Sequence, residues 1–513
     1  MDWDGQYDGL RESGAFFRPM RIPEQCSGEM LSAELQREFC FQSLDDAFIQ
    51  NTGSRLLKEL RKSQSADAVW LSHFFDVVAR YPVQSRQTAK HDIAYVIPFI
   101  PSIALFSTPR RVTKRNEGDT NEQDRSWKPG PFIKECLSYC LPTEQLDAFF
   151  KEIQTAVHVS DADDLFARFI TEKTNEALQE HLDIRITDKL FPEAYRHGKE
   201  CFMPQAVRDR ITVAPFKRFA DDIKAVLSVK PFVSRRQFMA MLESVIRIGT
   251  SAHVLWMCNI NRRLEKDLFA LFNSGEGQFT EAQLFDALNM PSSGILSYGM
   301  NFQMRMKEFF KAYERSTKRL SFLLCRLKEV ASLPHETYDW SSPEAFVKSI
   351  NDINGYIKAN PTFLAEYESD FSRHYLDAIK KYTLKVDCQA THLLRFVQTA
   401  LVQNNQPSSE RYSRYDQSYL LRHRTHSNRS AVIVNAGAVT LMALVHGCSC
   451  NSSTVLLSNL IDALLAYGVA IPPGETMETF KMQLRELGLT IDSPDAESGM
   501  VLQDIVGTGE EAI

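Results

Sequence analysis

The sequence predicts a mainly α protein in which a multi-helical body precedes a C-terminal winged-helix-like module. Apolar side chains recur three and four residues apart along most of the chain, which is the spacing of one helix face. The longest such segment, 298–331, has no proline and, after Gly299, no glycine, so we expect one helix of about 30 residues. Residues 431–513 show three short helical segments followed by a strand, a turn and a strand, which is the element order of a winged helix.

Composition and length agree with this fold class. The 513 residues are 44% apolar and 24% charged, which is typical of a soluble globular protein. The length predicts two to four domains. A net charge of −6 argues against general electrostatic capture of nucleic acid, although local basic patches are compatible with it. We divide the chain at its polar stretches into an N-terminal helical region with a short extended segment (1–109), a charged linker or loop (110–130), a helical body (131–403), a basic linker (404–430) and the winged-helix-like module (431–513).

The elements follow from local patterns along the chain. Residues 43–80 have the apolar spacing of two amphipathic helices, and the β-branched and aromatic run 92–107 is the best strand or buried-loop candidate before residue 110. Ser160 is an expected N-cap, and Thr280 with Gln283 matches a capping box. We predict helices at 131–140, 143–157, 161–179, 205–228, 234–249, 252–273, 343–358, 361–383, 388–403, 436–446, 453–467 and 474–487, and a hairpin at 489–505.

Signatures of catalysis are missing from the sequence. It contains no GxxxxGK[ST], GxGxxG, HExxH or GxSxG motif, so we predict no enzyme activity and no cofactor. Three acidic pairs could in principle bind magnesium in a nuclease, but each falls at an expected helix start, where a carboxylate interacts favourably with the helix dipole. These pairs are Asp45/Asp46, Asp163/Asp164 and Asp221/Asp222.

The ten cysteines are scattered, mostly inside apolar helical patterns, which predicts a reducing cytoplasmic environment. Cys136 and Cys140 lie four residues apart, and His446, Cys448 and Cys450 fall within five residues. Neither group has the matching second pair of a structural zinc site, so we favour buried thiols and predict no metal. We also predict no membrane span, because the apolar run 93–106 is too short and the uncharged run 430–461 is divided by a polar cluster.

The basic segment 411–429 is the strongest candidate for a binding site. Its arginines alternate with Tyr412, Tyr415 and Tyr419, a mixture that can contact phosphates and stack on bases. The alternative is a solvated linker that docks on acidic patches of its own protein. The third helix of the module carries three glutamates against Lys481 and Arg485, which favours a protein-docking role over a DNA-reading one. The predicted nucleic-acid-binding residues are Arg411, Arg414, Arg422, Arg424 and Arg429.

The same C-terminal region resembles a known family of subunits. The basic stretch 424–430, the segment 456–468 (LLSNLIDALLAYG) and the segment 484–506 (LRELGLTIDSPDAESGMVLQDIV) resemble the tail of the G subunit of DNA-phosphorothioation-dependent restriction systems. They are also similar to subunits of methylation-associated antiphage systems. The resemblance covers about 90 of the 513 residues. It implies a non-catalytic scaffold that docks ATPase or nuclease subunits of a defence complex and could contact DNA.

Two other function classes stay open at this point. One is a free-standing DNA-binding regulator, which needs basic groove-reading helices. The other is an enzyme whose site is assembled from residues far apart in the sequence, which motif spacing does not test.

Overall fold

The computed structural model describes ten ranges of the chain, and the following description is confined to them. These ranges are 46–74, 129–161, 163–185, 203–331, 341–382, 389–402, 419–424, 431–450, 455–491 and 500–504. The predicted extended segment 92–107 and charged loop 110–130 lie outside the described residues.

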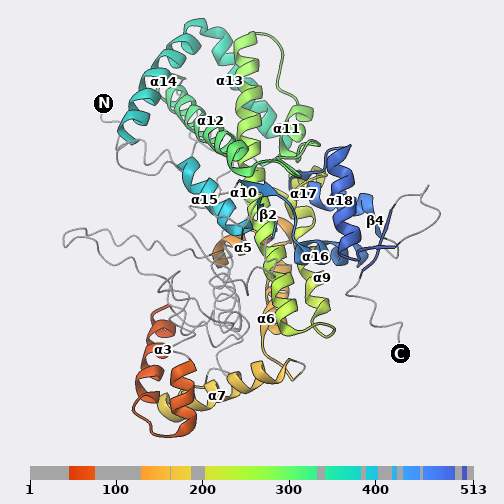
Figure 1. Cartoon of the computed structure of the whole chain (residues 1–513). Helices are drawn as coiled ribbons and strands as arrows, with labels where there is room; N and C mark the ends of the chain where they lie inside the picture. The colour runs from red at the N-terminus through yellow and green to blue at the C-terminus, as the bar shows by residue number, and fades with distance from the viewer. Residues whose placement is uncertain are drawn as a thin grey trace.

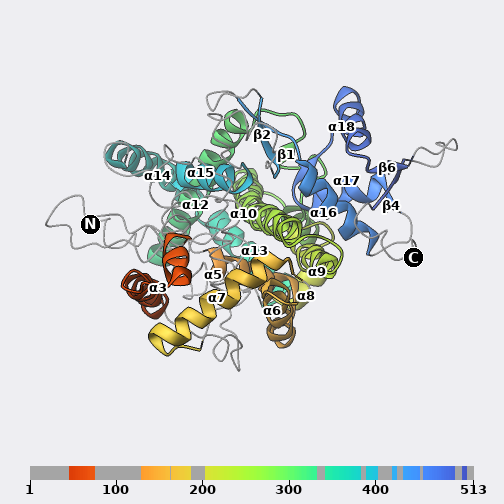
Figure 2. The same cartoon turned by 60° about the horizontal axis from the view of Figure 1, so that its bottom comes forward.

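Helices dominate the described residues, and the prediction of a mainly α fold is confirmed (Figures 1 and 2). Helical residues 66–74 follow α3. Up to residue 331 the helices are α3 (Asp46–Leu60), α5 (Pro129–Cys140), α6 (Thr143–Val157), α7 (Leu165–Leu182), α8 (Gln205–Arg210), the short 3₁₀ helix η5 (Pro215–Lys217), α9 (Phe219–Val229), α10 (Arg235–Ser274), α11 (Glu281–Leu288) and α12 (Phe302–Ala331). After it come α13 (Pro343–Ala359), α14 (Pro361–Tyr382), α15 (Gln389–Leu401), α16 (Ala438–Ser449), α17 (Leu457–Ala466) and α18 (Glu475–Glu486).

Helix α10 is the central element of the molecule. Its 40 residues extend for about 60 Å and join the two segments 234–249 and 252–273 that the sequence pattern suggested separately. Gly249 does not interrupt it, because the missing side chain leaves room for the ring of Phe219. Helices α5, α9, α11, α12, α13, α15 and α16 all pack against α10. No helix among the described residues is long and apolar enough to cross a membrane.

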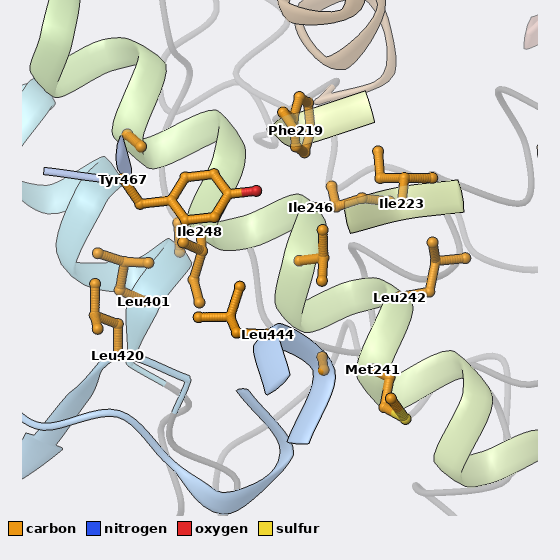
Figure 3. Close-up of a cluster of buried hydrophobic side chains, with 14 of the residues drawn as sticks. Phe219, Ile223, Met241, Leu242, Ile246, Ile248, Leu401, Leu420, Leu444 and Tyr467 are labelled. Atoms are coloured by element: carbon orange, nitrogen blue, oxygen red, sulfur yellow. The ribbon is translucent and has the colours of Figure 1, made fainter. Parts of the chain in front are cut away.

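Two hydrophobic cores meet along α10. The first gathers side chains of α5, α6, α9, α15, α16 and α17 around the first half of α10, and Figure 3 shows part of it. The second lies around Trp256 and the C-terminal half of α10, with α11, the second half of α12, α13 and α14. Because α16 and α17 belong to the first core, the predicted C-terminal module packs directly on the helical body.

Most predicted helices occur close to their expected positions, and two further predictions were wrong in detail. The single helix expected at 205–228 is divided into α8, η5 and α9, because Pro215 lacks the N–H that a continuous helix needs. Helix α7 is capped by Asp164, whose side chain accepts from the Ala167 amide, and not by Ser160. The Thr280–Gln283 capping box of α11 is confirmed.

Strands are short and form three small sheets. A parallel pair joins β1 (Leu296–Ser297) to β5 (Val469–Ala470), and an antiparallel pair joins β2 (Leu421–His423) to β3 (Val432–Val434). The third sheet has the order β4–β7–β6, from β4 (Val455–Leu456), β6 (Thr490–Ile491) and β7 (Val501–Leu502). The predicted pairing within 489–505 is therefore present, and β4 adds a strand that was not predicted.

The element order α16–β4–α17–α18–β6–β7 places three helices before an antiparallel pair, as the sequence pattern suggested. The assignment of this module to the winged helices stays a prediction. The predicted basic linker 404–430 is not irregular throughout, because its residues 421–423 form β2.

Candidate functional site

Two of the five predicted DNA-binding arginines are described, Arg422 within β2 and Arg424 directly after it. Leu421 is buried, and Arg422 and Arg424 are exposed. Arg422 pairs with Ile433 of β3, and the Arg424 backbone amide donates to the Ala431 carbonyl at 2.9 Å. Among the described residues, neither guanidinium forms an ion pair. The remaining predicted residues, Arg411, Arg414 and Arg429, lie outside the described residues.

A buried arginine of α10 holds the segment that leads into β2. Arg247 forms an ion pair with Glu243 at 2.7 Å and donates to the Ala400 carbonyl at the end of α15 at 2.8 Å. Its guanidinium also lies over the ring of Tyr419, 4.8 Å from the ring centre. Helix α10, together with the end of α15, thus supports the start of the β2–β3 hairpin.

This arrangement corrects one part of the sequence interpretation. Tyr419 was expected to stack on bases, but its side chain is only 6% exposed and its ring is covered by Arg247. Its carbonyl accepts from the Thr440 hydroxyl at 2.6 Å, which fixes it further against α16. Tyr419 therefore belongs to the core. Tyr412 and Tyr415 lie outside the described residues.

A second polar group lies beneath the C-terminal module, around Asp222 of α9. The Asp222 carboxylate is 1% exposed and accepts from Arg218 at 2.8 Å and from the Tyr467 hydroxyl at 2.5 Å. Burial raises the pKa of Asp222, and the Arg218 guanidinium opposes this effect. A Cβ at Gly447 of α16 would overlap the carboxylate, so the helix approaches it closely. This carboxylate is occupied by structural contacts and has no open side for a metal or a substrate.

Asp163, another of the acidic residues considered for magnesium, is also held by cations. It forms ion pairs with Arg235 at 3.0 Å and Lys230 at 3.6 Å, and it accepts from the Ser160 amide at 2.7 Å. Burial alone would raise the pKa of Asp163, but Arg235 and the Ser160 amide together lower it. Asp163 thus links the start of α7 to α9 and α10.

His446 at the end of α16 lies between a carboxylate and a backbone carbonyl. Its Nδ1 lies 2.7 Å from the Asp504 carboxylate, and its Nε2 lies 3.1 Å from the Ala225 carbonyl. Ser228 and Cys450 are further from Nε2, at 3.4 and 3.6 Å. Since both ring nitrogens face hydrogen-bond acceptors, the ring is held in place between α9 and Asp504.

The thiols near His446 are not activated. Burial raises the pKa of Cys450, and the Asp504 carboxylate raises it further. Cys448 points to the other side of α16, 3.5 Å from Arg218, and burial raises its pKa. An activated nucleophilic thiol has a lowered pKa.

The other cysteine pair considered from the sequence lies in α5. Cys136 is fully buried in α5, and the Cys140 thiol donates to the Cys136 carbonyl at 3.3 Å. In the described part of the chain, no group of three or more His, Cys, Asp or Glu side chains is arranged to hold a metal ion.

Sequence reasoning did not find the two polar groups beneath the module. Asp222 and Tyr467 are 245 residues apart, and His446 and Asp504 are 58 residues apart. No local pattern links such distant positions. Comparison of the sequence with known protein families and with curated proteins finds no match in either case.

Proposed function

We propose that this chain is a non-catalytic scaffold or adaptor subunit of a prokaryotic antiphage DNA-restriction complex in the cytoplasm. In this proposal it docks ATPase or nuclease partners and contacts DNA with Arg422 and Arg424. The observation that carries the DNA contact is the pair of exposed arginines on a hairpin that Arg247 holds against the body. The defence context rests on the resemblance of the C-terminal region.

The structural surroundings of the titratable groups support a non-catalytic role. The carboxylates of Asp163 and Asp222 are paired with cations. A nuclease built on either residue would need its carboxylate free to bind magnesium. An open groove between α6 and α9 reaches Ser228, but the hydroxyl of this serine donates to the Ala225 carbonyl at 2.7 Å.

The charge of α18 supports partner docking over a stand-alone regulator. We propose that α16, α17, α18 and the β4–β7–β6 sheet form a winged helix whose third helix faces protein. Glu475, Glu478 and Glu486 of α18 are exposed, and Lys481 is engaged with Glu478 at 2.8 Å. An acidic helix surface repels the phosphate backbone that a recognition helix must approach.

Co-purification tests the scaffold role. The full-length protein, tagged and expressed at native level with its neighbouring genes, should bring down ATPase or nuclease subunits in fixed proportion. Recovery of the protein alone, with specific DNA binding retained, would favour the regulator instead.

Charge reversal tests the DNA contact. In the complex, changing Arg422, Arg424 and Arg429 together to Glu should reduce the slope of log affinity against log salt concentration by roughly 0.9 for each duplex phosphate that the protein no longer neutralises. The affinity of a labelled duplex is measured at two salt concentrations. Unchanged affinity at both, together with a loosened C-terminal module, would favour the linker interpretation.

A further inference from the structure

Exposed aromatic side chains gather where α7 meets the helical segment 66–74. Trp70, Phe166 and Phe169 are each 41–44% exposed. The ring centre of Trp70 lies 5.8 Å from that of Phe169 and 5.5 Å from that of Phe74. Phe74 is half-buried, and its ring centre lies 6.3 Å from that of Phe166. The rings therefore form one connected surface that crosses from one helix to the other.

Leu165 extends this surface along α7. It is 79% exposed and precedes Phe169 by four residues, so the two side chains are neighbours on one helix face. We name the exposed side chains Trp70, Leu165, Phe166 and Phe169 the aromatic patch. A whole aromatic side chain has about 150–250 Å² of surface, so the three exposed rings present roughly 200–300 Å², to which Leu165 adds. Connected apolar surface of this size often marks an interaction site, and aromatic side chains are enriched in the centres of protein interfaces.

Acidic residues surround the aromatic patch. Glu172 and Glu176 follow Phe169 by three and seven residues, which places them on the same outward face of α7. The exposed carboxylates beside the patch are Asp67, Asp161, Asp164, Glu172 and Glu176, and we name them the acidic rim. The basic residues within 66–74, 161 and 163–176 are Arg168 and Lys173, so five carboxylates against two cations leave a formal surplus of three negative charges.

The two cations of this surface are already engaged by carboxylates of the rim. Lys173 forms ion pairs with Glu176 at 2.8 Å and with Asp67 at 3.6 Å, and both carboxylates raise the pKa of Lys173. Arg168 forms an ion pair with Asp161 at 3.4 Å. The charge that this surface offers to a partner is therefore negative.

We propose that the aromatic patch and the acidic rim bind an amphipathic helix of a partner protein, with apolar side chains on one face and lysines or arginines beside it. A third helix can pack on the junction of two helices with side chains three and four residues apart. The basic flank is required by the charge of the rim, which repels DNA and anionic lipid surfaces. The inference rests on the partner docking of the proposed function and adds the site and the chemistry of the docked segment.

The position of the patch is compatible with the proposed DNA contact. Helix α7 and the β2–β3 hairpin lie apart in both views of the molecule (Figures 1 and 2). A helix docked on α7 therefore leaves Arg422 and Arg424 accessible.

Two synthetic peptides serve as probes of this surface. Each has about 18 residues, long enough to form a helix on binding, with leucines three and four residues apart. One carries lysines beside the leucines, and its twin carries glutamates at the same positions. Binding of each fluorescent peptide to the full-length protein is measured by anisotropy at about 50 mM salt, where exposed charges are weakly screened.

Three variants of the full-length protein identify the binding surface, and circular dichroism verifies that each is folded. The first, Phe166→Ala with Phe169→Ala, removes half of the patch. The second, Glu172→Lys with Glu176→Lys, reverses charge on exposed residues of the rim and leaves the patch intact. The matched control is Phe232→Ala, which removes an exposed ring between α9 and α10.

The basic peptide should bind the wild type and the Phe232→Ala control equally. The Phe166→Ala, Phe169→Ala variant should weaken its binding by at least about thirtyfold, the effect of losing one strong aromatic anchor. The Glu172→Lys, Glu176→Lys variant should weaken it by about tenfold, because two exposed attractive pairs become repulsive, and should strengthen binding of the acidic twin. The inference is wrong if the basic peptide does not bind, if both peptides bind the wild type equally, or if the Phe232→Ala control weakens binding as much as the patch variant.

Co-purification separates this inference from the proposed function. If the wild type brings down ATPase or nuclease subunits and the Phe166→Ala, Phe169→Ala variant keeps them all, the inference is wrong and the scaffold role stands. If the wild type brings down none, the scaffold role fails and the peptide measurements alone decide the inference. If the wild type alone sediments as a dimer that the patch variant dissociates, a second copy of the chain occupies the patch and the inference is wrong.

Discussion

His253, in the middle of α10, is a fully buried histidine held in its neutral form. Its ring lies among the side chains of Tyr139, Phe219 and Trp256, and its Nδ1 lies 2.7 Å from the Gly249 carbonyl. Its Nε2 is buried without a hydrogen-bond partner among the described residues. Burial therefore lowers the pKa of His253 to about 4.

This shift predicts a loss of stability in mild acid. In the unfolded chain His253 takes up a proton near its ordinary pKa of about 6.5, whereas the folded protein resists protonation down to about 4. The stabilising effect is complete above the unfolded pKa and decreases as the pH falls toward the folded one. Between about pH 7.5 and about pH 5 the free energy of unfolding should fall by about 2 kcal/mol more in the wild type than in His253→Gln. Urea unfolding of both proteins at both pH values measures this difference, and equal losses would contradict the prediction.

Two helical glycines should respond oppositely to the same change. A Cβ at Gly249 overlaps the Phe219 ring, whereas a Cβ at Gly355 in α13 meets no atom within 4 Å. Gly249→Ala should cost about 1–3 kcal/mol through overpacking, and Gly355→Ala should stabilise by about 0.5–1 kcal/mol through helix propensity. Thermal unfolding of the two variants compares them, and a shift of the same sign in both would contradict the close-packing argument.

At the scale of elements, the sequence was informative where local chemistry decides structure. The capping residues Thr280 and Gln283 and the helix Thr143–Val157 follow from short-range patterns. The division of 205–228 was missed because apolar periodicity continues across Pro215 while the backbone hydrogen bonding does not. Strand β2 was missed because a three-residue strand surrounded by arginines has the composition of a linker.

The contact between α9 and α17 depends on a buried carboxylate, and this gives a third prediction. Asp222→Ala should lower the free energy of unfolding by about 3–5 kcal/mol, because it leaves Arg218 without its partner in a largely buried position. Asp221→Ala is the matched control, since Asp221 is exposed in the same first turn of α9. Denaturant unfolding should show a small effect for the control, and similar losses in both variants would refute the structural role of Asp222.

For the whole molecule, we expect the purified chain to have neither ATPase nor nuclease activity. The sequence lacks a phosphate-binding loop, and the carboxylates of Asp163 and Asp222 are engaged by cations. The assay uses ATP and a supercoiled plasmid with magnesium, and Asp163→Asn and Asp222→Asn serve as paired variants. DNA cleavage that either substitution abolishes would establish an enzyme and displace the scaffold proposal.

Only part of the candidate binding surface could be predicted from the sequence, because the surface depends on how distant segments of the chain pack together. Arginine-rich composition makes Arg422 and Arg424 candidates, but whether a neighbouring aromatic ring is exposed depends on packing. Arg247, from a distant part of the sequence, covers the ring of Tyr419. Which side chains cover one another is decided by the three-dimensional fold, and a single sequence does not show it.

The packing of α16 on α10 has a consequence for biosynthesis. The ribosome completes Ser274 long before it reaches Ala438, and at about 5–20 residues per second the interval is roughly 10–30 s. Throughout that time the apolar face of α10 that α16 covers in the folded protein is still exposed. The nascent chain is therefore a natural client for chaperones, and a protein terminated before α16 should accumulate as inclusion bodies even though most of its helices are already present.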